Sequence, residues 1–222
     1  PRTIPGFEID GTLVVTSDEL LSIDRVPDRV AVIGGGAIGC EFASMLSDYG
    51  STVTLLEAAP EILVGCDTDV ATAIRRSFRR RKIDVHVGTA VHGHRPTDNG
   101  ATVVSHGPID SDDESVDLEV DLVVDLVVVS VGRRPRGDSA GLVGTRVVVD
   151  ERGFVEVDDR LRTGEPGVYA VGDVVATPQL AHVGFAEGMF VVGDLLGESP
   201  RPIDPSTVPW CIYSHPEVAF AG

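Results

Sequence analysis

One stretch of the sequence, residues 30–57, constrains the fold more than any other. A short β-branched run ends at Gly34, and Gly36 and Gly39 then complete a G-x-G-x-x-G pattern. A helical pattern follows, and a second apolar run ends in the acidic Glu57. A strand, a glycine-rich turn, a helix and a strand in this order, with an acid about 20 residues past the glycines, predict a dinucleotide-binding βαβ unit.

The three glycines have separate physical roles in such a unit. Gly34 allows the tight turn, Gly36 lets backbone N–H groups approach a pyrophosphate, and Gly39 lets the helix pack closely on its strand. The helix N-terminus adds oriented N–H donors and a partial positive charge. The alternative is a glycine-rich turn in an unrelated α/β domain, and the flanking strands and the acid argue against it.

The acid at the end of the second strand predicts which nucleotide is bound. A carboxylate at this position accepts hydrogen bonds from the adenosine ribose hydroxyls and repels a 2′-phosphate. No Arg or Lys occurs in residues 58–63, directly after Glu57. The pattern therefore favours NAD over NADP, and the alternative for Glu57 is a solvated acid at a strand end.

Composition excludes several functional classes. The net charge of −17 and the lack of a basic, aromatic-rich stripe argue against nucleic-acid binding. No apolar run reaches the roughly 18 residues of a membrane span. The cysteines, Cys40, Cys66 and Cys211, are scattered and form no C-x-x-C or C-x₄-C pair, which fits a reducing cytoplasm. His92 and His94 alternate without a third placed ligand, so no metal site is expected.

A helix is expected over residues 67–81, followed by short strands at residues 84–87, 90–93 and 101–105 that suggest an inserted β-meander. The end of this helix is strongly basic. Two interpretations are open for it, an anionic partner or a solvated face whose cations complement the helix dipole, and the second is favoured.

An acidic stretch at residues 110–121 is expected to be a solvated loop. Asp-Leu-Val-Val then occurs twice in tandem, at residues 121–124 and 125–128. A shift of four residues preserves strand parity, so either copy could occupy the strand that follows.

The second half of the chain is expected to contain several short elements. Residues 179–196 read as a helix ended by Gly197. The strand-like runs are residues 146–149, 154–157, 168–171 (as a buried strand) and 208–213.

Six sequence blocks together resemble the pyridine nucleotide–disulfide oxidoreductase family, and within it the dihydrolipoamide dehydrogenase branch. They are residues 5–11, 34–41, 131–135, 169–174, 180–182 and 215–219. The resemblance implies an α/β fold: a doubly wound, Rossmann-like NAD-binding domain with an inserted β-meander, plus part of an FAD-binding domain. The implied divisions are an exit segment from the first FAD half (1–24), the NAD domain (25–145), the second FAD half (146–200), and a linker with the start of the dimer-interface domain (201–222).

The resemblance also implies which residues bind each cofactor. For NAD these are Gly34, Gly35, Gly36, Ala37, Ile38, Gly39, Cys40, Glu41, Glu57, Val91 and Gly132. Of these, Glu41 is expected near the nicotinamide, Val91 on the adenine side and Gly132 on the nicotinamide side. For FAD they are Asp173, which would bind the ribityl chain, and Gln179, Leu180, Ala181 and His182 at a helix start facing the flavin ring. A packed helix histidine is the alternative for His182, and a turn or capping acid for Asp173.

The sequence also departs from the family pattern. It lacks the first FAD-binding G-x-G-x-x-G, the C-x₄-C redox pair and the C-terminal His–Glu acid/base pair. The chain is therefore expected to be the middle of a longer cytoplasmic enzyme, with no catalytic residue of its own and no activity alone. The whole enzyme would be a homodimer that passes electrons from dihydrolipoamide, carried on a lipoyl domain, through a disulfide and FAD to NAD. The alternatives are a mercuric- or glutathione-type reductase and a catalytically silent NAD-binding module.

Overall fold

The computed structural model describes residues 1–109 and 120–221. Most of the acidic stretch, residues 110–119, lies outside the described residues. Contacts divide the chain into two compact units. The first holds residues 1–133 and 211–220, and the second holds residues 134–210 with the last two residues.

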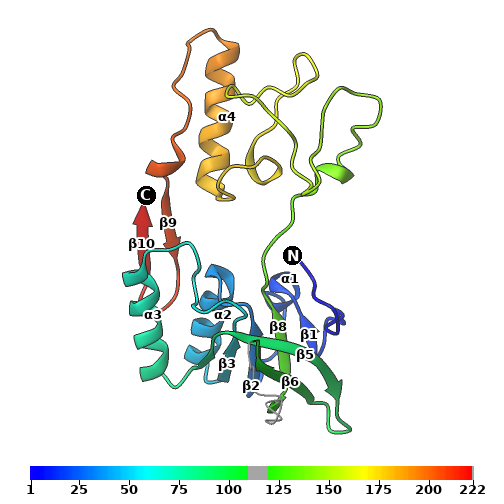
Figure 1. Cartoon of the computed structure of the whole chain (residues 1–222), viewed down its shortest axis with the longest axis vertical. Helices are drawn as coiled ribbons and strands as arrows, with labels where there is room; N and C mark the ends of the chain where they lie inside the picture. The colour runs from blue at the N-terminus through cyan, green and yellow to red at the C-terminus, as the bar shows by residue number, and fades with distance from the viewer. Residues whose placement is uncertain (110–119, 222) are drawn as a thin grey trace. The chain divides into compact units, whose positions relative to one another are not determined.

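A five-stranded parallel sheet forms the centre of the first unit (Figure 1). Its strands, in spatial order, are β1 (Val14–Val15), β8 (Leu126–Val129), β2 (Arg29–Ile33), β3 (Thr52–Leu56) and β4 (Asp84–His86). The unit's helices are α1 (Ser17–Leu20), α2 (Ala37–Asp48) and α3 (Thr68–Arg80). The crossovers through α2 and α3 confirm the predicted α/β, Rossmann-like class.

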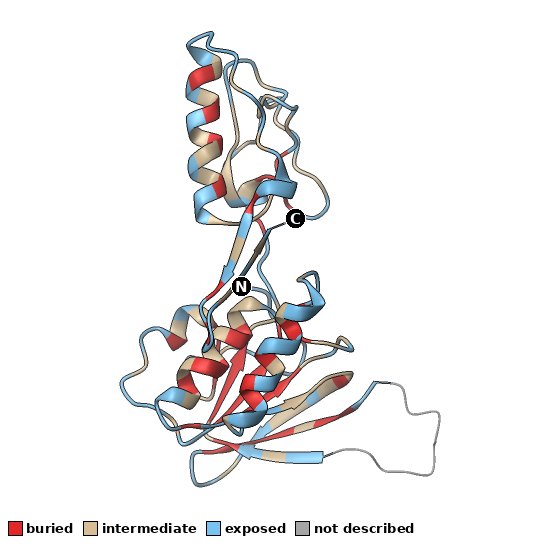
Figure 2. Ribbon diagram, turned by 90° about the vertical axis from the view of Figure 1, so that its left-hand side faces the viewer, coloured by how far each residue is buried: buried red, intermediate tan, exposed pale blue. Residues whose placement is uncertain are grey.

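Both faces of this sheet are buried (Figure 2). On β2, Val30 and Val32 pack in one cluster with apolar side chains of α2 and α3. Ala31 and Ile33 point to the opposite face and pack in a second cluster. Burial on both faces explains why the central strands read as continuous apolar runs.

An antiparallel meander covers the second face. Its strands are β5 (Thr89–Pro96), β6 (Thr102–Pro108) and β7 (Val120–Val124). Val104 and Val124 from the meander join the cluster that contains Ala31. The predicted meander is confirmed, with one correction. The run at residues 84–87 is β4, which pairs with β3 in the parallel sheet because Thr54 to Leu56 lie beside Asp84 to His86.

The tandem Asp-Leu-Val-Val copies lie in different sheets. The first is in β7 of the meander, and the second leads into β8 of the parallel sheet. The prediction that one copy or the other would occupy a single strand is therefore wrong. Asp125 separates the two strands: its backbone N–H donates to the Arg29 carbonyl, and its carboxylate accepts from the Arg29 N–H at 2.9 Å and guanidinium at 2.7 Å.

The second unit is mostly irregular. It contains α4 (Ala181–Leu195) and the 3₁₀ turns η1 (Gly137–Ser139), η2 (Gly172–Val174) and η3 (Pro205–Thr207). The runs at residues 146–149, 154–157 and 168–171 form only isolated bridges, Val149 with Val155 and Arg162 with Tyr169. The predicted strands there, including the buried one, are wrong. A strand needs a neighbour along its whole length, and the described residues of this unit provide none.

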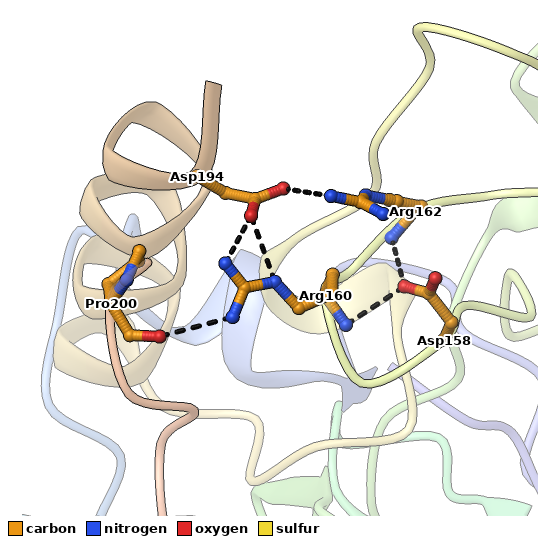
Figure 3. Close-up of polar contacts among 5 residues, drawn as sticks. All are labelled: Asp158, Arg160, Arg162, Asp194 and Pro200. Carbon is orange, nitrogen blue, oxygen red and sulfur yellow. Dashed lines mark hydrogen bonds and ion pairs between the residues drawn. The ribbon is translucent and has the colours of Figure 1, made fainter. Parts of the chain in front are cut away.

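A cluster of Asp158, Arg160, Arg162 and Asp194 links the C-terminal end of α4 to the loop at residues 158–162 (Figure 3). The Asp194 carboxylate accepts hydrogen bonds from the guanidinium groups of Arg160 and Arg162. Arg160 also donates to the Pro200 carbonyl at 3.1 Å. The Asp158 carboxylate accepts the backbone N–H groups of both arginines at 2.9 Å, which holds their loop in one conformation.

Strands β9 (Pro209–Ile212) and β10 (Val218–Ala221) pair in a two-stranded ribbon and run in opposite directions (Figure 1). Its turn region belongs to the first unit and contacts α3 and the residue after it: the His215 carbonyl accepts from Ser77 Oγ at 2.7 Å and from Arg81 at 3.2 Å. The peptide bond before Pro216 is cis. The strand expected at residues 208–213 is confirmed as β9.

Candidate dinucleotide-binding site

The glycine-rich loop makes a tight turn at the end of β2. Gly34 has φ +103°, and a Cβ on it would lie 2.6 Å from the Ser130 carbonyl oxygen. Its N–H donates to the Leu56 carbonyl at 2.8 Å. Only glycine combines this backbone conformation with so close an approach to the neighbouring strand end.

Gly39 and Gly36 differ sharply in their surroundings. A Cβ on Gly39 would overlap the carbonyl oxygen of Gly34, so α2 packs directly on the loop there. A Cβ on Gly36 would meet no heavy atom within 4 Å. The loop is therefore closed on its helix side at Gly39 and open at Gly36, where a ligand could approach the backbone.

The N-terminus of α2 presents unpaired donors at this opening. Gly36 is the N-cap and offers no side chain to the first turn, which also carries no acid. The Cys40 N–H makes the first intrahelical bond, to the Gly36 carbonyl. Helix geometry leaves the N–H groups of Ala37, Ile38 and Gly39 without intrahelical partners, and the helix dipole adds partial positive charge. This arrangement suits the phosphates of a dinucleotide.

Glu57 contacts the same loop from the end of β3. Its Oε2 accepts the Gly35 N–H at 2.5 Å, and its Oε1 accepts the Ala59 N–H at 2.6 Å. A carboxylate has about four acceptor positions, and this one is only half-buried, so capacity remains for ligand hydroxyls.

Two residues that the sequence did not indicate support the loop. Ser130, just after β8, donates its hydroxyl to the carbonyls of Ile33 at 2.9 Å and Gly34 at 3.1 Å. Ile62 lies so close that a Cβ on Gly35 would be 2.8 Å from its Cγ2. Neither position has a local signal, because a serine after a strand and an isoleucine in a loop are common in any domain.

Other residues predicted to bind NAD lie in α2, in β5 and shortly after β8. Cys40 is buried, its Sγ donates to the Gly35 carbonyl at 3.4 Å, and burial raises the pKa of its thiol. Glu41 accepts the Tyr213 N–H at 2.8 Å. Val91 is half-buried against the cluster beneath the meander, and Gly132 is exposed with φ +108°.

The residues predicted to bind FAD gather around one turn of the second unit. Asp173 is exposed in η2, and Gln179 donates from its side chain to the Asp173 carbonyl at 3.2 Å. Leu180 is the N-cap of α4 and makes no side-chain cap, and Ala181 and His182 form the exposed first turn. The N–H groups of Ala181 and His182 therefore have no intrahelical partner, whereas those of Val183 and Gly184 donate to the Leu180 carbonyl at 3.0 and 3.1 Å.

The sequence did not indicate two further residues close to Asp173 and the start of α4. Glu187 on α4 is 2% exposed, and its Oε2 accepts the Gly172 N–H at 2.5 Å, directly before Asp173. The Thr177 hydroxyl is buried and has no hydrogen-bond partner among the described residues. A buried hydroxyl without a partner is costly, so a ligand that paired with it would be favoured.

Residues 1–109 and 120–221 were also compared with the requirements of a metal site and of a membrane span. No group of three or more potential ligands could hold a metal ion in that part of the chain. None of the helices described there is long and apolar enough to cross a membrane. All three cysteines are free.

The family profile described as pyridine nucleotide-disulphide oxidoreductase matches residues 1–188. The chain belongs to this family. It is 37% identical to dihydrolipoyl dehydrogenase of Bacillus subtilis over 222 residues, which cover 100% of the chain and 45% of that relative. The chain thus spans less than half the length of this relative.

Solved structures show the same fold. LpdA of Mycobacterium tuberculosis superimposes with a TM-score of 0.88 at 26% identity, covering 100% of this chain and 46% of that one. The HOCl-induced flavoprotein disulfide reductase RclA of Escherichia coli gives a TM-score of 0.84 at 31% identity, covering 99% of this chain and 48% of that one. The resemblance drawn from sequence blocks is confirmed at the level of the family.

Proposed function

We propose that the chain is the NAD-binding portion, and one wall of the FAD site, of a dihydrolipoyl dehydrogenase. The observation that carries this proposal is the contact between Glu57 and the glycine-rich loop at Gly35. It brings an acid suited to ribose hydroxyls to the same loop as the N–H donors suited to a pyrophosphate.

NAD would be held by residues of the first unit alone. The N–H groups of residues 36–39 would bind the pyrophosphate, and the remaining acceptor positions of Glu57 would bind the adenosine ribose. Glu41, Val91 and Gly132 would flank the two ends of the dinucleotide. The negative charge of Glu57 opposes a 2′-phosphate, so NADP would bind less well.

FAD would be held only partly by this chain. The Asp173 carboxylate would accept from the ribityl chain, and the first turn of α4, Gln179 to His182, would face the flavin ring. The buried Thr177 hydroxyl lies in the segment between η2 and α4 and fits a polar ligand there. When bound, the flavin supplies two-electron redox chemistry, and the positive helix end would stabilise its reduced, anionic form.

The exposed side of α4 supports a longer protein. Five apolar residues on this helix and at its C-cap are between 56% and 77% exposed: Phe185, Met189, Val192, Leu195 and Leu196. An apolar stripe of this size normally packs against another element. We propose that it packs against the remainder of the FAD domain, in the part of the relatives that this chain does not span.

In the whole protein, oxidation of a dihydrolipoyl group would be coupled to reduction of NAD. The partner would be a lipoyl domain of a 2-oxo acid dehydrogenase complex, and the protein would act as a cytoplasmic homodimer. The match to RclA keeps a second candidate open, another flavoprotein disulfide reductase. A full-length protein that oxidises dihydrolipoamide with NAD would favour the first.

Calorimetric titration of the chain with NADH and with NADPH tests the nucleotide assignment directly. We expect NADH to bind at least tenfold more tightly than NADPH. Equal affinities would contradict the assignment of Glu57 to the ribose, and binding of neither nucleotide would contradict the assignment of the glycine-rich loop.

A further inference from the structure

The first unit has a second candidate site, beside α3. A hollow of about 720 Å³ lies between this helix and the edge strand β4. This volume is typical of sites that bind small molecules. The lining residues are Glu61, Thr72, Arg75, Arg76, Arg79, Lys82, Ile83, Asp84 and Val85.

The hollow is strongly cationic in a chain that is strongly acidic. Six of the chain's 18 basic residues occur within residues 75–82, and four of them line the hollow. Arg75 is paired with Glu61 at 3.1 Å. The Asp84 carboxylate lies 2.8 Å from His86 Nε2, a contact that cancels its charge only when the imidazole is protonated. Among the described residues, Arg76, Arg79 and Lys82 have no ion pair. Their three positive charges outnumber the one other carboxylate of the lining, that of Asp84, so the hollow keeps a net positive charge.

Helix stability alone does not account for this arrangement. Cations in the last turn complement the helix dipole, which explains Arg79 and Arg80. Arg76 lies one turn earlier, and like charges three residues apart, as in Arg76 and Arg79, destabilise a helix. Lys82 has φ +61°, where glycine or asparagine is favoured. Both features cost stability, which fits retention for a ligand.

We propose that this hollow binds a small polyphosphorylated molecule through its phosphate groups. The Arg76 and Arg79 guanidinium groups can each form paired hydrogen bonds to phosphate oxygens, and Lys82 can add a point charge. Ile83 and Val85 line an apolar part of the hollow that suits the organic part of such a ligand. The site is separate from the glycine-rich loop and does not depend on the proposed NAD site.

The net charge of the chain, −17, limits how far from the hollow an anionic ligand is attracted. The field of the whole chain repels anions from a distance, so affinity must come from direct contacts within the hollow. Binding should weaken as salt rises, because the three cations are solvent-accessible.

The test is calorimetric titration of the chain with inorganic tripolyphosphate at low ionic strength, with NADH present to occupy the glycine-rich loop. Arg76→Gln and Arg79→Gln should each weaken binding, and the double variant Arg76→Gln/Arg79→Gln should lose at least tenfold in affinity. Arg80→Gln is the matched control, since Arg80 is on the same helix but does not line the hollow, and it should bind like the wild-type chain. Circular dichroism verifies that each variant is folded.

The outcomes separate a built site from general charge attraction. Equal weakening by Arg80→Gln and by either Arg76→Gln or Arg79→Gln would overturn the proposal, because only overall charge would then matter. Absence of tripolyphosphate binding to the wild-type chain would overturn it as well. A loss confined to the variants that line the hollow supports it, whether or not NADH itself is bound.

Discussion

The Glu57 carboxylate binds the backbone N–H of Gly35 across 2.5 Å, although 22 residues separate them in the sequence. This contact ties the end of β3 to the loop after β2. The two parts of the motif therefore support one another before any ligand arrives. Preorganisation of this kind lowers the cost of ordering the loop on binding.

Replacing Glu57 by alanine should weaken NADH binding about ten- to hundredfold and reduce discrimination against NADPH. Loss of a hydrogen bond to a charged group costs on the order of 1.5–3 kcal/mol, which corresponds to that change in affinity. Titration of both nucleotides measures it. Glu8→Ala, at an exposed acid of the same unit, is the control and should change neither affinity.

Two alanine substitutions in the glycine-rich loop should affect different properties, one the stability of the chain and the other its affinity for NADH. Gly39→Ala should lower stability by about 1–3 kcal/mol, because its Cβ would overlap the Gly34 carbonyl. Gly36→Ala should leave the unfolding midpoint nearly unchanged, since its Cβ has free space and its φ is −71°. It should nevertheless weaken NADH binding at least tenfold by filling the approach to the backbone donors. Unchanged NADH affinity in the folded Gly36→Ala chain would contradict a pyrophosphate site there.

The arginine–aspartate cluster around Asp194 predicts how the stability of the chain depends on pH. Hydrogen bonds from Arg160 and Arg162 hold the pKa of the Asp194 carboxyl below its ordinary value. Because the folded pKa is the lower one, this stabilisation is complete above the unfolded pKa of about 3.9 and is lost as pH falls through the folded pKa.

Asp194→Asn should therefore destabilise the chain at neutral pH and have a progressively smaller effect below about pH 4. Thermal unfolding followed by circular dichroism across this range measures the difference. Asp159→Asn, at an exposed acid beside the same loop, is the matched control. A constant difference between Asp194→Asn and the wild-type chain down to the lowest pH would refute the linkage.

Sequence reasoning succeeded where local signals and the final environment agree. The unit from β2 to β3 was predictable because its glycine-rich loop and its apolar runs each have a local cause, and Gly50, with φ +99°, ends the helix between them. The expected FAD-half strands failed because strand formation depends on neighbours that local pattern does not supply. Ser130, Ile62 and Glu187 were missed because their roles arise from contacts between segments distant in the sequence.

The two Asp-Leu-Val-Val copies show the same limit of local sequence. Identical sequences occupy different sheets, and the two aspartates have different partners there. Asp125 binds both the backbone and the side chain of Arg29, whereas Asp121 binds Arg95 at 2.6 Å and Ser105 at 2.8 Å on an exposed surface.

Asp125→Ala should therefore lower the unfolding midpoint by about 2–4 °C, while Asp121→Ala should change it by about 1 °C or less. The Arg29 N–H would lose its acceptor at the junction of β7 and β8, but the partners of Asp121 stay hydrated when it is removed. Thermal unfolding of the two single variants measures both midpoints. The comparison is matched because the same substitution is made in the same four-residue sequence. Equal shifts would mean that the Arg29 contact contributes no more than an ordinary surface ion pair.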